Sequence, residues 1–221
     1  MPRPPETAHV PPVPRVARFS PAQRRVHRAT AALMLTCLAT AAVLYLPSLS
    51  QLVGRRGMVR TVHEWAGLLL PVPLLLGLVS HHLRADLTRL NRFTAADRTW
   101  LRAVRHGSPH RPAGKFNAGQ KLYAAFTAGA VLVLLGTGLL MWFTGLAPLA
   151  WRTGATFVHD WLATAVAVAV TGHIWMAARD PEARRGMRTG TVSRPWAARE
   201  HPDWTPDLTP GLTPDGAPDR T

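Results

Sequence analysis

The sequence has one cysteine, Cys37, and few acidic residues. A single cysteine excludes an intrachain disulfide framework and a cysteine-based metal site. Only 12 acidic residues accompany 26 lysines and arginines, so the formal net charge is +14. Charged residues nevertheless make up only 17% of the chain, and 47% of it is hydrophobic. This combination is typical of a membrane protein with basic connecting segments.

Charged side chains are missing from four long stretches. No Asp, Glu, Lys or Arg occurs in residues 29–46, 65–83, 122–151 and 161–178. Each stretch is long enough to cross about 30 Å of hydrocarbon as a helix, and none alternates as a barrel strand would. The sequence therefore predicts an all-α fold, a transmembrane four-helix bundle with spans at about residues 28–48, 62–83, 120–144 and 156–178.

The basic residues are distributed unevenly between the segments that join these spans. Residues 1–28, 84–121 and 179–221 hold 22 lysines and arginines, whereas the two other connections hold 4. Because positive residues remain on the inner side, we expect both termini and the loop 84–119 in the cytoplasm and the protein in the cell membrane. The arginines follow the membrane boundary and form no groove-reading motif, so nucleic acid is not an expected partner.

The two ends of the chain differ in composition from the centre. Residues 1–17 are rich in proline and residues 205–221 have few apolar side chains, so we expect disordered tails there. Residues 18–204 then form the membrane domain. In the long loop, apolar residues spaced as on one helix face predict short amphipathic helices on the inner surface: Leu87, Leu90, Phe93, Leu101 and Val104.

Four histidines fall near the ends of the predicted spans. His159 and His173 are fourteen residues apart, which places them about 21 Å apart along a helix and about 40° apart around it. They therefore share a face, with His159 at the outer level and His173 at the inner level. On the same topology, His63 begins the second span at the outer level and His27 begins the first span at the inner level.

Depth alone pairs His63 with His159 and His27 with His173. Two imidazoles that face each other across a bundle are what a six-coordinate haem iron requires. Small residues on neighbouring faces could leave room for the porphyrin: Gly67, Gly136, Gly138 and Gly172. A different class remains open, a haem-free membrane anchor or assembly protein in which the histidines form hydrogen bonds between helices. Zinc is less favoured, because no level gathers three or four ligands.

A second inner ligand is compatible with the spacing. His63 and His81 are eighteen residues apart, five whole helical turns, so they also share a face. His81 or His82 could therefore replace His27 as the partner of His173. The spacing of the residues leaves this choice open.

Several motifs resemble the gamma, or cytochrome b, subunit of membrane-bound formate dehydrogenase. The resemblance covers about residues 18–204 and is carried by RFSPAQRRVH, GRRGMVRTVHEWAG, GKFNAGQK, FVHDW, GHIWMA and the final GTVSRPW and HPDW. The most specific of these are KFNAGQK and the C-terminal pair. One departure is Arg28, which follows His27 where the family usually has tryptophan, so the family's packing beside the inner haem is not expected to carry over unchanged, whereas ligation by His27 is.

The resemblance implies two haem b groups. It assigns His63 and His159 to the outer haem iron and His27 and His173 to the inner haem iron, which favours His27 over His81. It also implies a quinone pocket near the inner haem, formed by Asn117 together with Gly119, Gln120 and Lys121. The residues themselves also predict a helix-capping box, because Asn117 and Gln120 have N-x-x-Q spacing before an apolar run.

The resemblance further implies a non-catalytic electron-transfer subunit that could hold the quinone-reduction site. Its expected partners are an iron–sulphur subunit and a molybdenum-containing catalytic subunit at the outer face. Electrons would pass from the outer haem to the inner haem and then to quinone. A hydrogenase or another molybdenum oxidoreductase could use the same scaffold.

Overall fold

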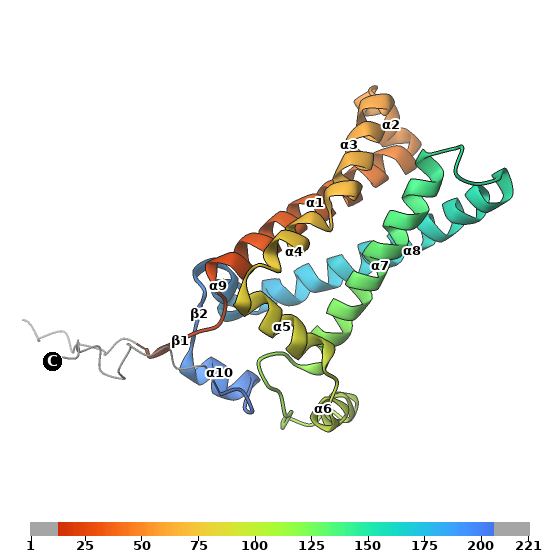
Figure 1. Ribbon diagram of the computed structural model, residues 1–221. Helices are drawn as coiled ribbons and strands as arrows, with labels where there is room; N and C mark the ends of the chain where they lie inside the picture. Colours follow the sequence, from red (N-terminus) through yellow and green to blue (C-terminus); the bar gives the residue numbers. More distant parts are fainter. Residues whose placement is uncertain (1–12, 206–221) are drawn as a thin grey trace, which may run out of the picture.

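The computed structural model describes residues 13–205, and this part of the chain is mostly helical (Figure 1). In chain order its elements are β1 Arg15–Ala17, α1 Pro21–Tyr45, α2 Pro47–Val53, α3 Arg56–Leu69, α4 Val72–Gly77, α5 His81–Asn91, α6 Ala95–Arg105, α7 Ala118–Trp142, α8 Leu149–Arg179, α9 Pro181–Thr189, β2 Thr191–Ser193 and α10 Arg194–Glu200. The all-α expectation is confirmed. Residues 1–12 and 206–221 lie outside the described residues.

Three helices are long and apolar enough to cross a membrane: α1, α7 and α8. The segment Arg56–Gly77 and α5 pass the same test together as a bent pair, so the described residues hold up to four spans. These helices indicate a multi-pass membrane protein. α1 begins at Pro21 because Ser20 and Gln23 form a capping box on its first turn.

The second apolar stretch is interrupted, which differs from the single span expected at residues 62–83. Pro71 separates α3 from α4, and the chain then turns by 108° between Gly77 and His81. Arg84 stabilises the turn because its Nη1 donates to the carbonyls of Leu78 and Val79, at 2.7 and 3.1 Å. The first limb of this bent pair therefore ends at Gly77, and the next residues belong to the bend and to α5.

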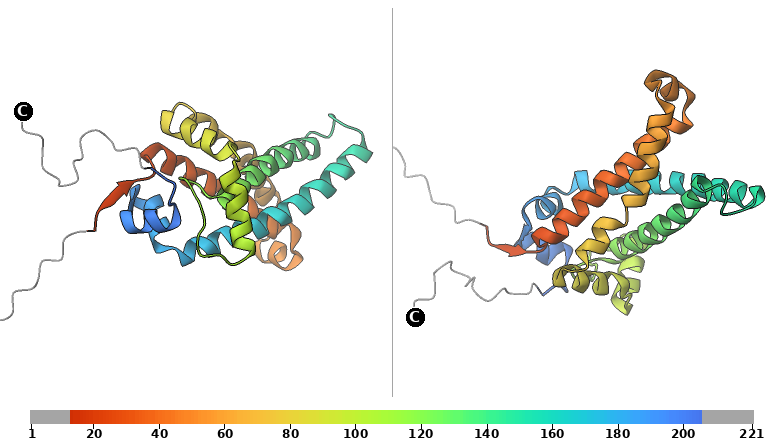
Figure 2. Two further views of the ribbon diagram at one scale, coloured as in Figure 1. Left: turned by 90° about the horizontal axis from the view of Figure 1, so that it is seen from below. Right: turned by 45° about the horizontal axis from the view of Figure 1, so that its top comes forward.

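The long helices form two hairpins. α1 packs against α3 and α4, and α7 packs against α8. Their tips, at α2 and at the turn between α7 and α8, lie apart from each other in all views (Figures 1 and 2). The hairpins meet through one buried apolar cluster, to which each long element contributes: Met34, Leu70, Ala130 and Val166.

A small second core lies at the end of the molecule that carries α5, α6 and α10 (Figure 1). β1 and β2 pair antiparallel there, with Val16 opposite Val192. Both valines are buried with Trp196. The expectation of a disordered tail through residue 17 is therefore wrong for residues 15–17, because Val16 gains a buried partner from the far end of the chain. The long loop forms α5 and α6, as the apolar spacing predicts.

Candidate haem-binding and quinone-binding sites

The structure brings the four histidines together in two pairs. The ring centroids of His63 on α3 and His159 on α8 are 6.2 Å apart. The centroids of His27 on α1 and His173 on α8 are 6.4 Å apart. α8 thus supplies one member of each pair, and the other members come from two different helices.

These separations leave room for one metal ion between the two rings of each pair. A metal–imidazole nitrogen bond is about 2.0–2.1 Å, so two imidazoles that share an ion would place their ligating nitrogens about 4 Å apart. A pair of imidazoles is also the axial donor set of a six-coordinate haem iron. The described residues contain no group of three or more His, Cys, Asp or Glu side chains that could hold a metal ion alone.

Three of the four glycines leave open space on the helix surfaces. A Cβ atom built on Gly67, Gly136 or Gly172 would meet no atom within 4 Å. Gly138 differs, because its Cβ would lie 3.5 Å from Cε1 of His159. Open space beside Gly67, Gly136 and Gly172 suits a large apolar plate such as porphyrin.

The buried cluster lies midway between the two histidine pairs. Val166 is seven residues from His159 and seven from His173 on α8. Met34 is likewise seven residues after His27, and Leu70 is seven after His63. Seven residues make almost two helical turns and rise about 10.5 Å. The apolar cluster therefore separates two equivalent levels, each with one histidine pair.

Threonines orient the two outer imidazoles. Thr40 Oγ1 lies 2.9 Å from Nδ1 of His63, and Thr137 Oγ1 lies 3.0 Å from Nδ1 of His159. Each hydroxyl donates its own proton to a carbonyl of its helix, that of Thr36 at 2.7 Å or of Val133 at 2.8 Å. With the hydroxyl proton on the carbonyl, the hydroxyl oxygen accepts from the imidazole, and both imidazoles then carry their proton on Nδ1. This tautomer leaves Nε2 as the nitrogen with a lone pair for a metal.

The inner pair is packed differently. The Tyr123 ring stacks on His173, with centroids 4.9 Å apart and an interplanar angle of 13°. Arg28, the departure noted in the sequence, turns toward α9, where its Nη2 donates to the carbonyl of Arg188 at 3.3 Å. The position beside His27 is thus occupied by a guanidinium bound to the C-terminal end of α9.

His81 and His82 lie on α5, beyond the bend. Their rings contact each other, with centroids 5.9 Å apart. His27, and neither of these, is the histidine whose ring faces that of His173. His63 and His81 would share a face only on an unbroken helix, and the chain bends by 108° between them.

The four residues proposed for quinone lie at the start of α7. Asn117 Oδ1 accepts from the Gln120 amide at 2.9 Å, and Gln120 Oε1 accepts from the Asn117 amide at 3.0 Å, which is the predicted capping box. Lys121 Nζ contacts Asp97 at 2.8 Å. A Cβ on Gly119 would lie 3.2 Å from the Trp100 ring. The cap uses Oδ1 of Asn117 and leaves its amide nitrogen for another acceptor.

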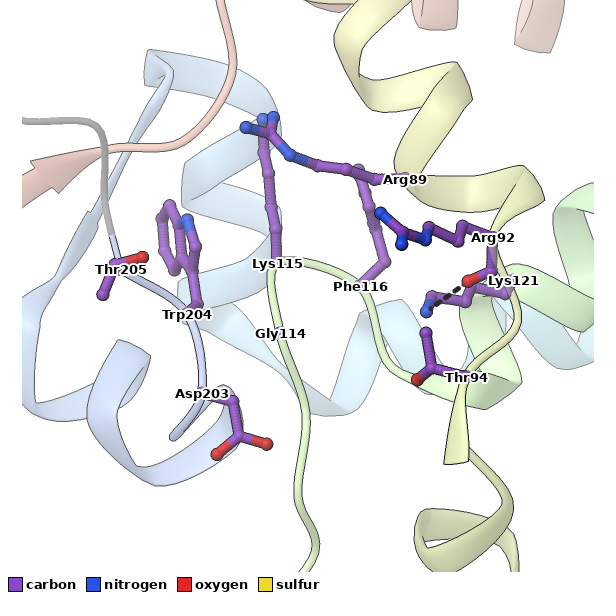
Figure 3. Close-up of a pocket in the computed structure, with 10 residues that line it drawn as sticks. All are labelled: Arg89, Arg92, Thr94, Gly114, Lys115, Phe116, Lys121, Asp203, Trp204 and Thr205. Carbon is purple, nitrogen blue, oxygen red and sulfur yellow. Dashed lines mark hydrogen bonds between the residues drawn. The ribbon is translucent and has the colours of Figure 1, made fainter. Parts of the chain in front are cut away.

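A pocket of about 290 Å³ lies beside this segment (Figure 3). Its lining includes four cationic residues, Arg89, Arg92, Lys115 and Lys121, together with Trp204 from the C-terminal segment. Arg89 and Lys115 share Asp86, and Lys121 contacts Asp97, so these two carboxylates offset about half of this charge. Of the residues proposed for quinone, only Lys121 lines this pocket.

Two histidine pairs held between apolar helices are the arrangement expected of a membrane-bound cytochrome b. The comparison with protein families gives the same class. Residues 18–190 match the model of the prokaryotic cytochrome b561 family, and the chain belongs to this family. Membership implies a b-type haem.

The resemblance to formate dehydrogenase cytochrome b subunits is confirmed by individual relatives. The chain is 31% identical over 166 residues to the "Formate dehydrogenase, nitrate-inducible, cytochrome b556(Fdn) subunit" of Escherichia coli (strain K12), covering 71% of this chain and 73% of that protein. It is 27% identical over 164 residues to the "Formate dehydrogenase, cytochrome b556 subunit" of Haemophilus influenzae, covering 71% of this chain and 66% of that protein.

Sequence reasoning did not identify Thr40, Thr137 or Tyr123 as neighbours of the histidines. Each lies on a different helix from the imidazole that it contacts. Thr40 and Thr137 are polar residues inside apolar spans at the depth of the outer pair, and this depth match is the signal that could have identified them.

Proposed function

We propose that this protein is the membrane subunit of a formate dehydrogenase complex, which passes electrons from an outer-face iron–sulphur subunit to a quinone near the cytoplasmic face. The observation that carries the proposal is the presence of two histidine pairs, 6.2 and 6.4 Å between centroids, at two levels of one bundle. The names of the relatives from Escherichia coli and Haemophilus influenzae support the assignment to formate dehydrogenase.

The two pairs would hold two haem b groups, with His63 and His159 on the outer iron and His27 and His173 on the inner iron. Haem in these positions would supply one-electron carriers that link the two faces of the membrane. Thr40 and Thr137 fix the tautomer of the outer ligands, and Tyr123 restrains the ring of His173 by stacking. The apolar cluster around Val166 lies between the two levels.

The quinone would bind at the start of α7. The cap formed by Asn117 and Gln120 holds the first turn in place, and the free side-chain amide of Asn117 can donate to a quinone oxygen. A helix N-terminus also favours a developing negative charge on that oxygen. The Lys121 ammonium, one residue beyond Gln120, is paired with the Asp97 carboxylate. Uptake of protons from the cytoplasmic side would make quinone reduction charge-separating.

The orientation follows from the charge distribution. The basic termini and the loop 84–119 would lie in the cytoplasm, with the His63/His159 level toward the outer face. The iron–sulphur subunit and the molybdenum-containing subunit would dock at that outer face, so this chain would carry no formate-oxidising residues.

Purification of the complex in mild detergent tests this function. We expect a reduced-minus-oxidised spectrum of two low-spin b haems per chain, co-purifying iron–sulphur and molybdenum subunits, and formate-dependent reduction of a quinone analogue. Co-purification of hydrogenase subunits would assign the same scaffold to a different complex. A colourless protein would refute an electron-transfer role.

A further inference from the structure

The segment that leads into Asn117 is bound by both ends of the membrane domain. Three consecutive carbonyls accept hydrogen bonds from residues distant in sequence. The carbonyl of Ala113 accepts from the Asp203 amide at 3.0 Å, that of Gly114 accepts from His201 Nδ1 at 2.7 Å, and that of Lys115 accepts from Arg18 Nη2 at 3.1 Å. This segment is therefore fixed by side chains and backbone that lie outside the long helices.

His201 is the centre of these contacts. Its side chain is buried, with 3% of the residue exposed, and both ring nitrogens are bonded. Arg18 Nη2 donates to Nε2 at 2.9 Å, and because an arginine can only donate, Nε2 must accept and Nδ1 must carry the proton for Gly114. Burial and the charge of Arg18 lower the pKa of His201 to about 4, so the imidazole is neutral at physiological pH.

Aromatic rings hold the two partners in place. The Arg18 guanidinium lies over the Trp196 ring, 4.7 Å from its centroid, and over the Trp204 ring at 5.8 Å. The His201 ring contacts the same two tryptophans, with centroid separations of 5.2 and 6.4 Å. The C-terminal residues of the HPDW motif thus form a packed unit with Arg18 rather than a free tail.

A buried ion pair fixes the other side of the segment. Lys115 Nζ contacts both oxygens of Asp86, at 2.7 and 2.8 Å, and Gln23 Nε2 contacts the same carboxylate at 2.6 Å. Gln23 lies one helical turn before His27 on α1, so this ion pair links the loop to the helix that carries an inner histidine.

We propose that His201 is a positioning residue for the segment Gly114–Asn117, and that the C-terminal segment thereby sets the affinity of the proposed quinone site. The inference rests on the proposed function, because it takes Asn117 as a quinone contact. Asn117 follows the bonded carbonyls by two residues, so loss of the His201 bridge releases the backbone that places its side chain. Small displacements of a binding group are sufficient to weaken an oriented contact.

The test compares His201→Phe, His201→Gln and Asn117→Ala in the full complex, with a short-chain ubiquinone analogue as acceptor. Loss of the two buried hydrogen bonds in H201F should raise the KM for the quinone analogue about tenfold or more. The H201Q variant should stay within about twofold of the wild type, because its amide supplies one donor and one acceptor. Electron transfer from formate to an artificial dye and the spectrum of both haems should remain unchanged in both variants.

Two results would overturn the proposal. One is a KM that rises in N117A but not in H201F, since the loop would then hold its place without His201. The other is an unchanged rate of hydrogen exchange at the amides of Asn117 and Asp203 in H201F. These amides donate to Gln120 Oε1 and to the Ala113 carbonyl, so release of the segment must make them less protected. This second measurement does not depend on quinone, so it tests the positioning role by itself. An unchanged KM in N117A would instead refute the assignment of Asn117 to the quinone site.

If H201F does not accumulate, His201→Ala with added imidazole provides the same test. The cavity left by the side chain should take up imidazole, which can again donate to the Gly114 carbonyl and accept from Arg18. Recovery of the quinone KM on addition of imidazole supports the role of His201, and a KM that is raised and does not respond to imidazole contradicts it.

Discussion

Replacement of Thr137 or Thr40 by valine should weaken the outer haem and leave the inner haem intact. Valine has nearly the shape of threonine, so the substitution removes one hydroxyl and little volume. In Thr137→Val, the Nδ1–H of His159 loses the acceptor that lies 3.0 Å away. In Thr40→Val, His63 loses its acceptor at 2.9 Å.

The magnitude follows from the loss of one of two acceptors near the imidazole, since the backbone carbonyls of Cys37 and Leu134 also interact with His63 and His159. A hydrogen bond contributes about 0.5–1.5 kcal/mol net, which corresponds to about 2- to 13-fold in an equilibrium constant. Loss of every partner to a ligating histidine typically lowers metal affinity about 10- to 100-fold. We therefore expect the outer haem to bind about tenfold more weakly in either variant, near the low end of that range. Its midpoint potential should rise, because the imidazole becomes a poorer electron donor to iron.

Haem transfer to an apoprotein acceptor and an optical redox titration measure these two effects. Thr36→Val is the matched control, because Thr36 lies one turn from Thr40 and its hydroxyl contacts only the carbonyl of Ala32 on the same helix. Equal behaviour of T36V and T40V, or a change at both haems in T137V, would refute the reasoning.

Three further predictions concern the fold around the site. Asp86→Asn should lower the free energy of unfolding by about 3–5 kcal/mol, because it leaves the buried charge of Lys115 without its partner, and thermal unfolding followed by circular dichroism should detect this. Gly77→Ala should lower the free energy of unfolding by about 1–3 kcal/mol, because its Cβ would lie 2.6 Å from side-chain carbons of two neighbours. Gly129→Ala is the control, because its Cβ would lie in open space and should leave the free energy of unfolding unchanged. Equal melting temperatures of the two variants would contradict this prediction. Below pH 6.5 the His201 imidazole takes up a proton in the unfolded state, whereas in the folded state it does so only near pH 4. The contribution of neutral His201 to the free energy of unfolding is therefore complete above pH 6.5, and about 3 kcal/mol of it is lost as the pH falls to 4. Tryptophan fluorescence of the C-terminal segment should follow this loss, and a signal that is flat from pH 7 to 4 would argue against it.

The histidine arrangement could be predicted from the sequence because it depends on helical periodicity. His159 and His173 share a face whatever the neighbouring helices do, and depth alone proposes their partners. The capping box of Asn117 and Gln120 is also local, so its spacing is sufficient to predict it. These features need only the geometry of one helix at a time.

Other features depend on contacts between distant segments. Hydropathy does not distinguish a straight span from one that bends at Gly77, because residues 65–83, which include the bend, contain no Asp, Glu, Lys or Arg. The pairing of Val16 with Val192, and the bridge from Arg18 to His201, join residues more than 170 positions apart. The threonine acceptors of the outer histidines likewise come from other helices, so no spacing within one segment reveals them.

The most direct test of the account is the haem content of single histidine variants of the purified complex. We expect two b haems per chain in the wild type, loss of one and the same haem in His63→Ala and His159→Ala, and loss of the other in His27→Ala and His173→Ala. His81→Ala should keep both. A wild-type chain with fewer than two haems, or loss of the inner haem in His81→Ala while His27→Ala retains it, would contradict the account.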